Sequence, residues 1–293
     1  MNCIEKIVIE AGEEHKNLDS VQRIWNVLEA HNASRQATLI NVGGGMITDL
    51  GGFAASTFKR GIHFMNVPTT LLAMVDAGFG GKTAINYGGV KNLVGSFAEP
   101  DEVWICPEVL KTLDGRNMRA GWAEMVKHGL IDSENLYKET LGVDLEKIDK
   151  ETIERSAEVK RRIVAEDPRE KGVRKTLNLG HTAGHAFEAV AEGKLLHGEA
   201  VAYGLVVAAY LSVVRLGLDK RLLTELRHWV TENYGVFPFD CKHYDRLWEA
   251  MRNDKKNIEG GKVMMALLRA IGRAEWGIEV TKEEMFEAID FLR

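Results

Sequence analysis

Three of the chain's nine histidines fall within one segment, "TLNLGHTAGHAFEAVAEGKLLHGEA", which covers residues 176–200. His181 and His185 are four residues apart, so a helix would place both on one face. His197 stands before a Gly-Glu pair at the start of another helical pattern, where a loop end can return it towards the other two. Imidazole nitrogens grouped in this way are typical zinc ligands. The segment therefore predicts a metal site, with ordinary core or surface histidines as the equal alternative.

A further ligand must come from elsewhere in the chain. The spacing is HTAGH and not HExxH, so the glutamate base of a metalloprotease is missing. Catalytic zinc uses three protein ligands and an open position, and a distant carboxylate can complete the set. The best candidate is Glu124 in "GWAEMVKHG", an acidic residue in an otherwise apolar stretch with Lys127 one turn later. The alternative is that Glu124 and Lys127 form an exposed i, i+3 ion pair.

A glycine run offers a second type of site. "VGGGMITDLGG" places Gly43, Gly44 and Gly45 where a β-like run ends and a helical pattern begins. The free backbone N–H groups of such a helix start suit a phosphate. The run is not GxGxxG, because Thr48 stands where the third glycine would be. Phosphate binding and a plain tight turn are both compatible with it.

Basic residues recur along the chain, and two of them have an unusual setting. Lys82 and Lys91 lie in the glycine-rich segment 76–97, which is poor at building a core but lets the backbone wrap a ligand. The other cations, each more typical of a solvated surface charge, are Arg60, Lys160, Arg161, Arg174, Lys175, Lys255 and Lys256. A metal and several cations at one site favour a phosphorylated, acidic, polyhydroxylated substrate.

The elements that must position these residues change in type along the chain. In the first third, β-like runs at 5–11, 37–42, 62–67 and 102–106 alternate with helical patterns at 18–31 and 69–75. This alternation predicts an α/β fold with a Rossmann-like parallel sheet, and the segment 76–97 is interpreted as an irregular hairpin or ribbon. From about residue 108 the periodicity is helical, apart from a partly β-like pattern at 262–280. We therefore expect an α/β domain over 1–110 and a mainly α-helical domain over 111–293.

The composition is that of a globular chain. Its 293 residues are 45% hydrophobic and 28% charged, and the net charge of -5 gives no reason to expect nucleic acid or an anionic membrane as partner. Cys3, Cys106 and Cys241 are far apart, which favours a reducing compartment and argues against disulfides and thiolate zinc sites. We find no signal peptide and no run of eighteen apolar residues, so a cytoplasmic protein without membrane contact is expected.

A series of motifs, in order along the chain, resembles the 3-dehydroquinate synthase family of the sugar-phosphate cyclase superfamily. They are "GEEHK", "GGGMITDLGGFAASTFKRG", "VPTTLLAMVDAGFGGKTAIN", "KNLVGSF", "AGWAEMVKHGLI", "RKTLNLGHTAGHAFE", "LLHGEAVAYG" and "NDKK". Each motif alone is weak, but together they are specific. The resemblance implies an NAD-binding α/β domain, a helical domain and an active site in the cleft between them.

The resemblance also implies residue roles. A divalent metal, zinc or cobalt, would be held by Glu124, His181 and His197, and His185 would face the substrate instead. The other implied substrate residues are Asp76, Lys82, Lys91, Asn92, Lys127, Lys160, Arg174, Asn178 and Lys256. The implied NAD residues are Glu13, Lys16, Gly44, Gly45, Asp49, Thr69, Thr70, Thr112 and Leu113, with Lys82 and Lys91 shared. Arg60 matches an arginine that reaches into a neighbouring subunit's site, which implies a homodimer.

The implied reaction converts 3-deoxy-arabino-heptulosonate 7-phosphate into 3-dehydroquinate and phosphate, in the shikimate pathway. It proceeds by oxidation with NAD, elimination of phosphate, reduction, and an intramolecular aldol step. The alternatives are another sugar-phosphate cyclase, a metal-dependent NAD alcohol dehydrogenase, or a non-catalytic remnant. The last follows from an expectation that the first βα unit of the NAD domain is missing, because Met1 stands only ten residues before "AGEEHK".

Overall fold

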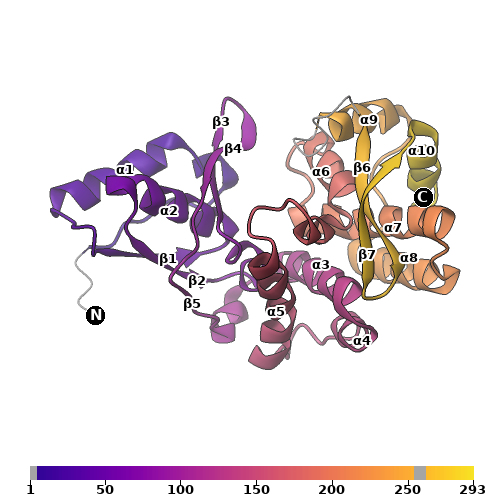
Figure 1. Cartoon of the computed structure of the whole chain (residues 1–293), viewed down its shortest axis with the longest axis horizontal. Coiled ribbons are helices and arrows are strands. Elements are labelled where there is room, and N and C mark those ends of the chain that lie inside the picture. Colours follow the sequence, from indigo (N-terminus) through magenta and orange to yellow (C-terminus); the bar gives the residue numbers. More distant parts are fainter. Residues whose placement is uncertain (1–4, 254–261) are drawn as a thin grey trace. The chain divides into compact units, whose positions relative to one another are not determined.

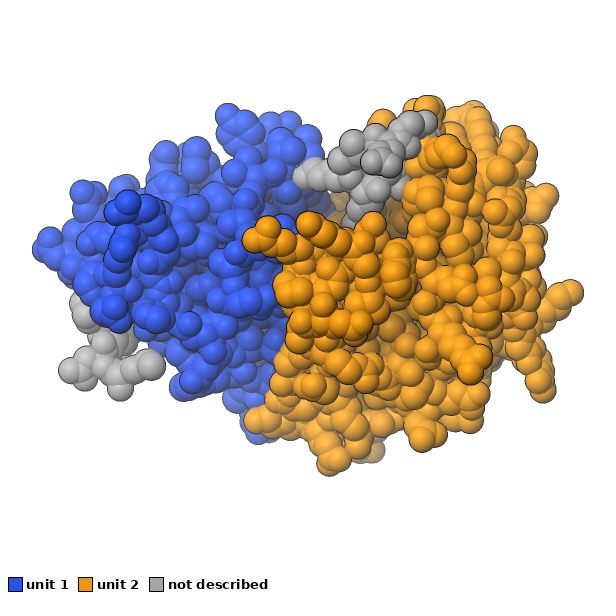
Figure 2. Space-filling view, viewed as in Figure 1, with its two compact units in different colours: residues 1–113 blue, residues 114–293 orange. Residues whose placement is uncertain are grey.

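The structure is a computed structural model in which residues 5–253 and 262–293 are described. The chain divides into two units, Met1–Leu113 and Asp114–Arg293, which Figure 2 shows in separate colours.

Unit 1 is built on a three-stranded parallel sheet with the order β1-β2-β5 (Figure 1). Its strands are β1 (Thr38–Gly43), β2 (His63–Pro68) and β5 (Glu102–Val103), and its helices are α1 (Leu18–Ala30) and α2 (Gly45–Thr57). The strands β3 (Lys82–Tyr87) and β4 (Val90–Phe97) form a separate antiparallel hairpin with one register shift. This arrangement confirms the predicted α/β class and the predicted ribbon.

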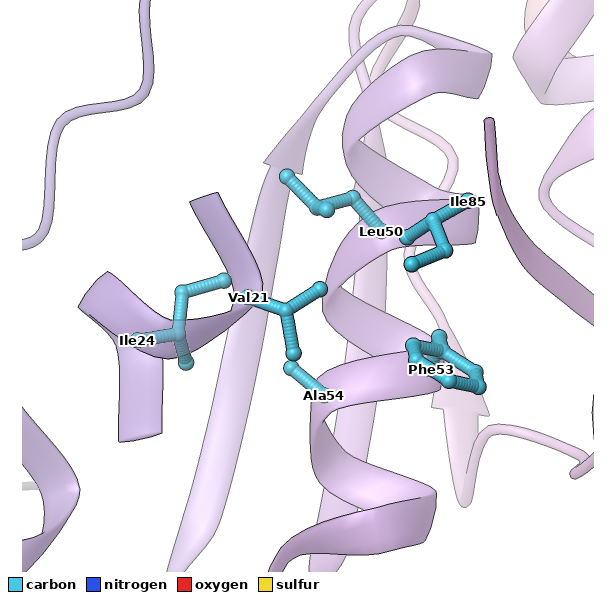
Figure 3. Close-up of a cluster of buried hydrophobic side chains, with 6 residues drawn as sticks. All are labelled: Val21, Ile24, Leu50, Phe53, Ala54 and Ile85. Carbon is cyan, nitrogen blue, oxygen red and sulfur yellow. The ribbon is translucent and has the colours of Figure 1, made fainter. Parts of the chain in front are cut away.

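The core of unit 1 joins both helices to the hairpin. Figure 3 shows the cluster, which consists of Val21, Ile24, Leu50, Phe53, Ala54 and Ile85. Val21 and Ile24 lie three residues apart on one face of α1, and Leu50, Phe53 and Ala54 repeat this spacing on α2. Such i, i+3 and i+4 spacing gives each helix one apolar stripe to bury. The middle of α2 thereby packs against α1 and β3.

One predicted strand is wrong and another is wrong in part. Residues 5–11 have no strand conformation, although Ile7 and Ile9 pack against the core cluster. Within the described residues no strand pairs with the outer edge of β1, and a strand exists only through ladder hydrogen bonds to a neighbour. The strand expected at 102–106 is shortened to Glu102–Val103, because Pro107 begins a 3-10 helix (Pro107–Thr112) and restricts the residue before it. The helical pattern at 69–75 ends in a π-helical turn, Ala73–Ala77.

Unit 2 is mainly helical, as predicted. Its helices are α3 (Gly115–Asp132), α4 (Glu134–Leu141), α5 (Lys150–Glu166), α6 (His181–Val190), α7 (His197–Leu216), α8 (Lys220–Tyr234), α9 (Tyr244–Arg252) and α10 (Lys282–Asp290). The pattern at 262–280 forms the antiparallel hairpin of β6 (Val263–Ala270) and β7 (Arg273–Val280). In Figure 1, α7 runs among α3, α6, α8 and β6, all of which contact it.

Helix α7 is the one described helix that is long and apolar enough to cross a membrane by length and composition. Its most apolar window is, however, 67% buried inside the unit. Apolar residues on all sides are expected of a helix enclosed by other elements. We therefore assign α7 as the central core helix of unit 2.

Candidate active site

Glu124 lies on α3 in the interior of unit 2. Its side chain is 0% exposed, and the Lys127 ammonium, 1% exposed, lies 2.5 Å from Glu124 Oε2. The alternative of an exposed surface pair is therefore wrong. Neither carboxylate oxygen accepts a hydrogen bond of normal geometry from the described residues. A buried carboxylate that lacks such hydrogen bonds is expected either to bind a cation or to lower the stability of the fold by several kcal/mol.

Two histidines approach this carboxylate from different helices. His181 Nε2 lies 3.4 Å from Glu124 Oε1, and His197 Nε2 lies 3.3 Å from the same oxygen. Ligands bound to zinc at about 2.0 to 2.2 Å in a tetrahedron are roughly 3.4 Å apart, so these separations match the edges of such a site. Because His181 and His197 are the first residues of α6 and α7, the two helix starts deliver both imidazoles.

The other ring nitrogen of each histidine is held by an acceptor. His181 Nδ1 lies 3.1 Å from the Leu179 carbonyl oxygen, and His197 Nδ1 lies 3.0 Å from Glu188 Oε2. If each Nδ1–H donates to its acceptor, each Nε2 presents its lone pair towards Glu124. This arrangement is the usual support for histidine metal ligands. Glu188 was missed in the sequence analysis, although it lies seven residues after His181, two turns along the same helix face.

The charges agree with a cation site. Burial alone would raise the pKa of Glu124, but the charge of Lys127 and the contact with His181 hold it well below the usual range. Burial lowers the pKa of His181, which keeps this imidazole neutral. Burial acts in the same direction on His197, yet contact with the Glu124 and Glu188 carboxylates raises its pKa. A divalent metal would take the place of that proton at Nε2. The residues present thus fit the metal that the resemblance implies.

His185 lies close to both other histidines. Its ring centroid is 5.3 Å from that of His181 and 5.7 Å from that of His197, and the three residues have ligand atoms within 4.8 Å of one another. Geometry alone therefore allows a second ligand set, in which His185 takes the place of Glu124. The carboxylate without normal hydrogen bonds favours the set that includes Glu124.

Close backbone contacts fix the helices that carry these ligands. A Cβ atom on Gly198 would lie 1.9 Å from the Ala120 carbonyl oxygen of α3. A Cβ on Gly204 would lie 2.0 Å from the carbonyl oxygen of Gly180, which has a φ of 77 and precedes His181. Glycine at these positions allows helix backbones to touch. The starts of α6 and α7 are thereby seated beside Glu124.

The other predicted substrate residues of unit 2 lie in nearby segments of the sequence. Lys160 is on α5, 8% exposed. The buried Arg174 donates from Nη1 to the Pro168 carbonyl at 2.6 Å, and Asn178 donates to Glu170 Oε1 at 2.6 Å, both from the 3-10 segment Val173–Asn178. Lys256 lies outside the described residues. The structure thus groups Glu124, Lys127, His181, His185 and His197, and places Arg174 and Asn178 in a separate hydrogen-bonded segment.

In unit 1, several predicted residues gather at the start of α2. Lys16 Nζ lies 2.5 Å from Asp49 Oδ2 and donates to Asn92 Oδ1 at 2.6 Å. Gly44 precedes α2 without a side-chain cap and contacts Thr70, since a Cβ on Gly44 would lie 3.0 Å from Thr70 Cγ2. Uncapped N–H groups at a helix start favour a phosphate over a plain turn.

The remaining predicted residues of unit 1 lie on surrounding elements. Lys82 begins β3, Lys91 is on β4, and Asp76 is in the π-helical turn. Glu13 begins the 3-10 helix Glu13–His15, and Gly45 begins α2. Thr69 donates its backbone N–H to the Gly43 carbonyl at 2.9 Å. Thr112 and Leu113 end unit 1. Arg60 lies in a turn after α2 with a φ of 69. Asn92, expected to bind substrate, accepts a hydrogen bond from Lys16, which is expected to bind NAD. The sequence did not indicate this contact.

Replacing Asp49 with alanine is expected to destabilise unit 1 by about 3 kcal/mol, because the buried Lys16 ammonium loses the nearer of its two carboxylates and keeps only Glu13 Oε1, at 3.9 Å. Lys16 is 4% exposed, whereas Asp49 keeps 19% exposure, so we expect the lower end of the usual range for broken buried pairs. Urea unfolding measures the change. Asp19→Ala on the exposed face of α1 is the control, and an equal effect in both variants would contradict the expectation.

Replacing Glu188 with alanine is expected to weaken divalent metal binding by about 10- to 100-fold, because His197 Nδ1 loses its acceptor. Competition with a chromogenic chelator measures the affinity. Glu192→Ala is the matched control, since Glu192 is exposed and pairs with Arg246 at 3.0 Å. Unchanged affinity in Glu188→Ala would rule out the supporting role.

Solved structures of sugar-phosphate cyclases share this fold. The 2-epi-5-epi-valiolone synthase ValA from Streptomyces hygroscopicus subsp. jinggangensis 5008, solved with NAD+ and Zn2+, is 27% identical with a TM-score of 0.83, covering 97% of this chain and 81% of that one. A 2-deoxy-scyllo-inosose synthase in complex with carbaglucose-6-phosphate, NAD+ and Co2+ is 26% identical with a TM-score of 0.81, covering 96% and 80%. A probable glycerol dehydrogenase from Sinorhizobium meliloti 1021, 15% identical with a TM-score of 0.58, covers 94% and 81% and shares the fold alone. The class is therefore that of the sugar-phosphate cyclases.

Sequence comparisons narrow the class. The family models described as 3-dehydroquinate synthase N-terminal and C-terminal match residues 6–120 and 121–257. The 3-dehydroquinate synthase of Parabacteroides distasonis is 47% identical over 98% of this chain and 83% of its own length, and that of Pyrococcus furiosus is 42% identical over 98% and 84%. The chain belongs to the 3-dehydroquinate synthase family, which confirms the resemblance stated from the motifs.

Proposed function

We propose that this chain converts 3-deoxy-arabino-heptulosonate 7-phosphate into 3-dehydroquinate and inorganic phosphate. One structural observation carries the proposal: in a chain of this family, a buried carboxylate lies 3.3 and 3.4 Å from two imidazole nitrogens that come from two helix starts. The identity of 47% to a 3-dehydroquinate synthase, against 26 to 27% to cyclases with other products, supports this substrate over theirs. The reaction class is a carbon-oxygen lyase, because a C–O bond to phosphate breaks without water.

The metal, Zn2+ or Co2+, would be held by Glu124, His181 and His197. When bound, it supplies Lewis acidity to a substrate hydroxyl, and NAD supplies a hydride acceptor that is regenerated in each turnover. The two oxygens of the Glu124 carboxylate have different neighbours. Oε1 lies beside His181 Nε2, where the metal would bind, and Oε2 lies beside the Lys127 ammonium. Lys127 thus holds the carboxylate in its charged form and fixes the direction in which Oε1 points.

The remaining residues of the chain would bind and orient the substrate. Oxidation of one substrate alcohol to a ketone acidifies the adjacent carbon, so loss of its proton can expel phosphate with the C–O electron pair. The ketone is then reduced again, and the ring opens and closes by an aldol step. We propose that His185, Lys160 and Arg174 hold the phosphate and carboxylate charges during these steps, so that most of the catalysis is orientation and electrostatics.

We also propose that unit 1 binds NAD at the start of α2, where Gly44, Gly45 and Asp49 lie with Lys16 and Thr70. We further propose that Arg60 of one subunit serves its neighbour in a homodimer. The buried position of α7 supports its role as a core helix and not as a membrane span.

The proposal is tested by turnover of the purified chain with NAD and Zn2+ or Co2+. We expect equimolar phosphate and 3-dehydroquinate from the heptulosonate, without net formation of NADH. Phosphate release from other sugar phosphates but not from this one would assign a different cyclase. Net NADH would assign a dehydrogenase, and failure to bind millimolar NAD in calorimetry with metal present would assign a non-catalytic role.

A further inference from the structure

The segment that presents His197 is held at the start of α7 by a carboxylate two residues later. Glu199 Oε2 accepts a hydrogen bond from the Leu196 backbone N–H at 2.8 Å. Glu199 thereby supplies one of the two hydrogen bonds of a capping box, since Leu196 at the N-cap has no side-chain acceptor for the other. The backbone that carries the His197 side chain lies inside this first turn of α7.

The same carboxylate is gripped by an arginine from α3. Arg116 Nε donates to Glu199 Oε1 at 2.6 Å, and Arg116 Nη2 donates to Glu199 Oε2 at 2.7 Å. Arg116 Nη2 also donates to the Lys194 carbonyl oxygen at 2.6 Å. A bidentate pair of this kind fixes direction as well as distance. Arg116 is itself seated by the α3 cap, since its backbone N–H donates to Asp114 Oδ1 at 3.0 Å.

These contacts form a register between two helices. Arg116, Ala120 and Glu124 are each four residues apart, so they follow one face of α3 over successive turns. In that order they contact Glu199 at 2.6 Å, Gly198 by backbone approach, and His197 at 3.3 Å. Three turns of α3 thus hold three consecutive residues at the start of α7. The ion pair lies at one end of this register and the metal-facing nitrogen at the other.

We propose that Arg116 and Glu199 are a positioning pair for His197, which sets the distance of its Nε2 from Glu124 Oε1. This inference rests on the proposed metal site. Neither residue touches the reacting atoms, and their effect passes through the backbone of residues 196–198. Groups that support a ligand in this way typically change metal affinity by about 10- to 100-fold.

The chain contains a matched control for this pair. At the start of α10, Glu284 Oε2 accepts from the Thr281 backbone N–H at 2.9 Å, and Arg215 Nη1 lies 2.8 Å from Glu284 Oε1. The side chains of Arg215 and Glu284 are 40% and 20% exposed, against 47% and 14% for Arg116 and Glu199. Both pairs join an arginine to the closing carboxylate of a first turn, but α10 carries none of the proposed metal ligands.

The test measures Co2+ affinity by chelator competition, and thermal unfolding of the metal-free protein, in E199Q, R116K and E284Q. We expect E199Q to bind Co2+ about 10- to 100-fold more weakly than the wild type, and E284Q to stay within about twofold, with similar losses of Tm. R116K keeps the charge but loses the fork geometry, so it should also bind more weakly than E284Q.

Wild-type affinity in E199Q and R116K, or an equal loss of affinity in E284Q, would overturn the inference and leave the metal site standing. If E199Q does not fold, R116K decides. A wild-type chain that does not bind Co2+ would instead overturn the metal site itself, and the positioning role with it.

Discussion

Replacing Glu124 with alanine is expected to remove the bound metal and to lower kcat by roughly a thousandfold or more, because the metal supplies several kcal/mol of transition-state stabilisation. The variant also deprives Lys127, 1% exposed, of the carboxylate beside it. Loss of stability is therefore expected as well, by about 3 to 5 kcal/mol. Metal content after dialysis, phosphate release and thermal unfolding are measured on the same preparation.

Glu124→Gln keeps the size of the side chain and leaves no cavity, but it also loses the charge that binds the metal and pairs with Lys127, so it too should lose the metal. Glu134→Ala is the control, because Glu134 forms an exposed helical ion pair with Lys138 at 3.6 Å. Such a pair contributes little, so stability and turnover should be unchanged within about 0.5 kcal/mol. Full metal retention in both Glu124 variants would contradict the proposed ligation.

Replacing Gly198 with alanine is expected to destabilise unit 2 by about 3 kcal/mol or more. The added Cβ would lie 1.9 Å from the Ala120 carbonyl oxygen, and backbone on both sides leaves no side chain to rotate away. The start of α7 must then move from α3, which carries His197 away from Glu124. Chemical denaturation and metal affinity measure the two consequences.

Gly115→Ala is the control for Gly198→Ala. Gly115 begins α3, and its nearest contact for a new Cβ is Arg119 Nη1 at 3.5 Å, which is ordinary van der Waals distance. Its stability should change by no more than about 0.5 kcal/mol. A Gly198→Ala variant as stable as Gly115→Ala would show that the helix contact is not rigid.

Local patterns predicted most of the fold. The alternation of β-like and helical runs indicated the parallel sheet, and the glycine-rich segment 76–97 indicated the hairpin of β3 and β4. Residues 5–11 carry a β-like pattern as well but have no strand conformation. A strand depends on a neighbour that supplies ladder hydrogen bonds, and a local pattern contains no information on that neighbour.

The site could be predicted only in part from spacing. His181 and His185 are the obvious pair on a helix, whereas Glu124 lies far from both in the sequence and reaches them by packing of α3 against α6 and α7. That packing depends on glycine at contacts that the sequence does not reveal, such as Gly198 against Ala120. Helical spacing from His181 could have indicated Glu188. No local spacing could have indicated the contact of Arg116 with Glu199, because these residues are 83 apart in the sequence.

The metal content of His185→Ala, measured after exhaustive dialysis beside His197→Ala, tests the ligand assignment most directly. His185, His181 and His197 lie close enough together for a metal site of three histidines, so the geometry allows either outcome. With Glu124, His181 and His197 as ligands, His185→Ala retains stoichiometric metal and loses turnover, while His197→Ala loses both. Loss of the metal from His185→Ala would contradict the account.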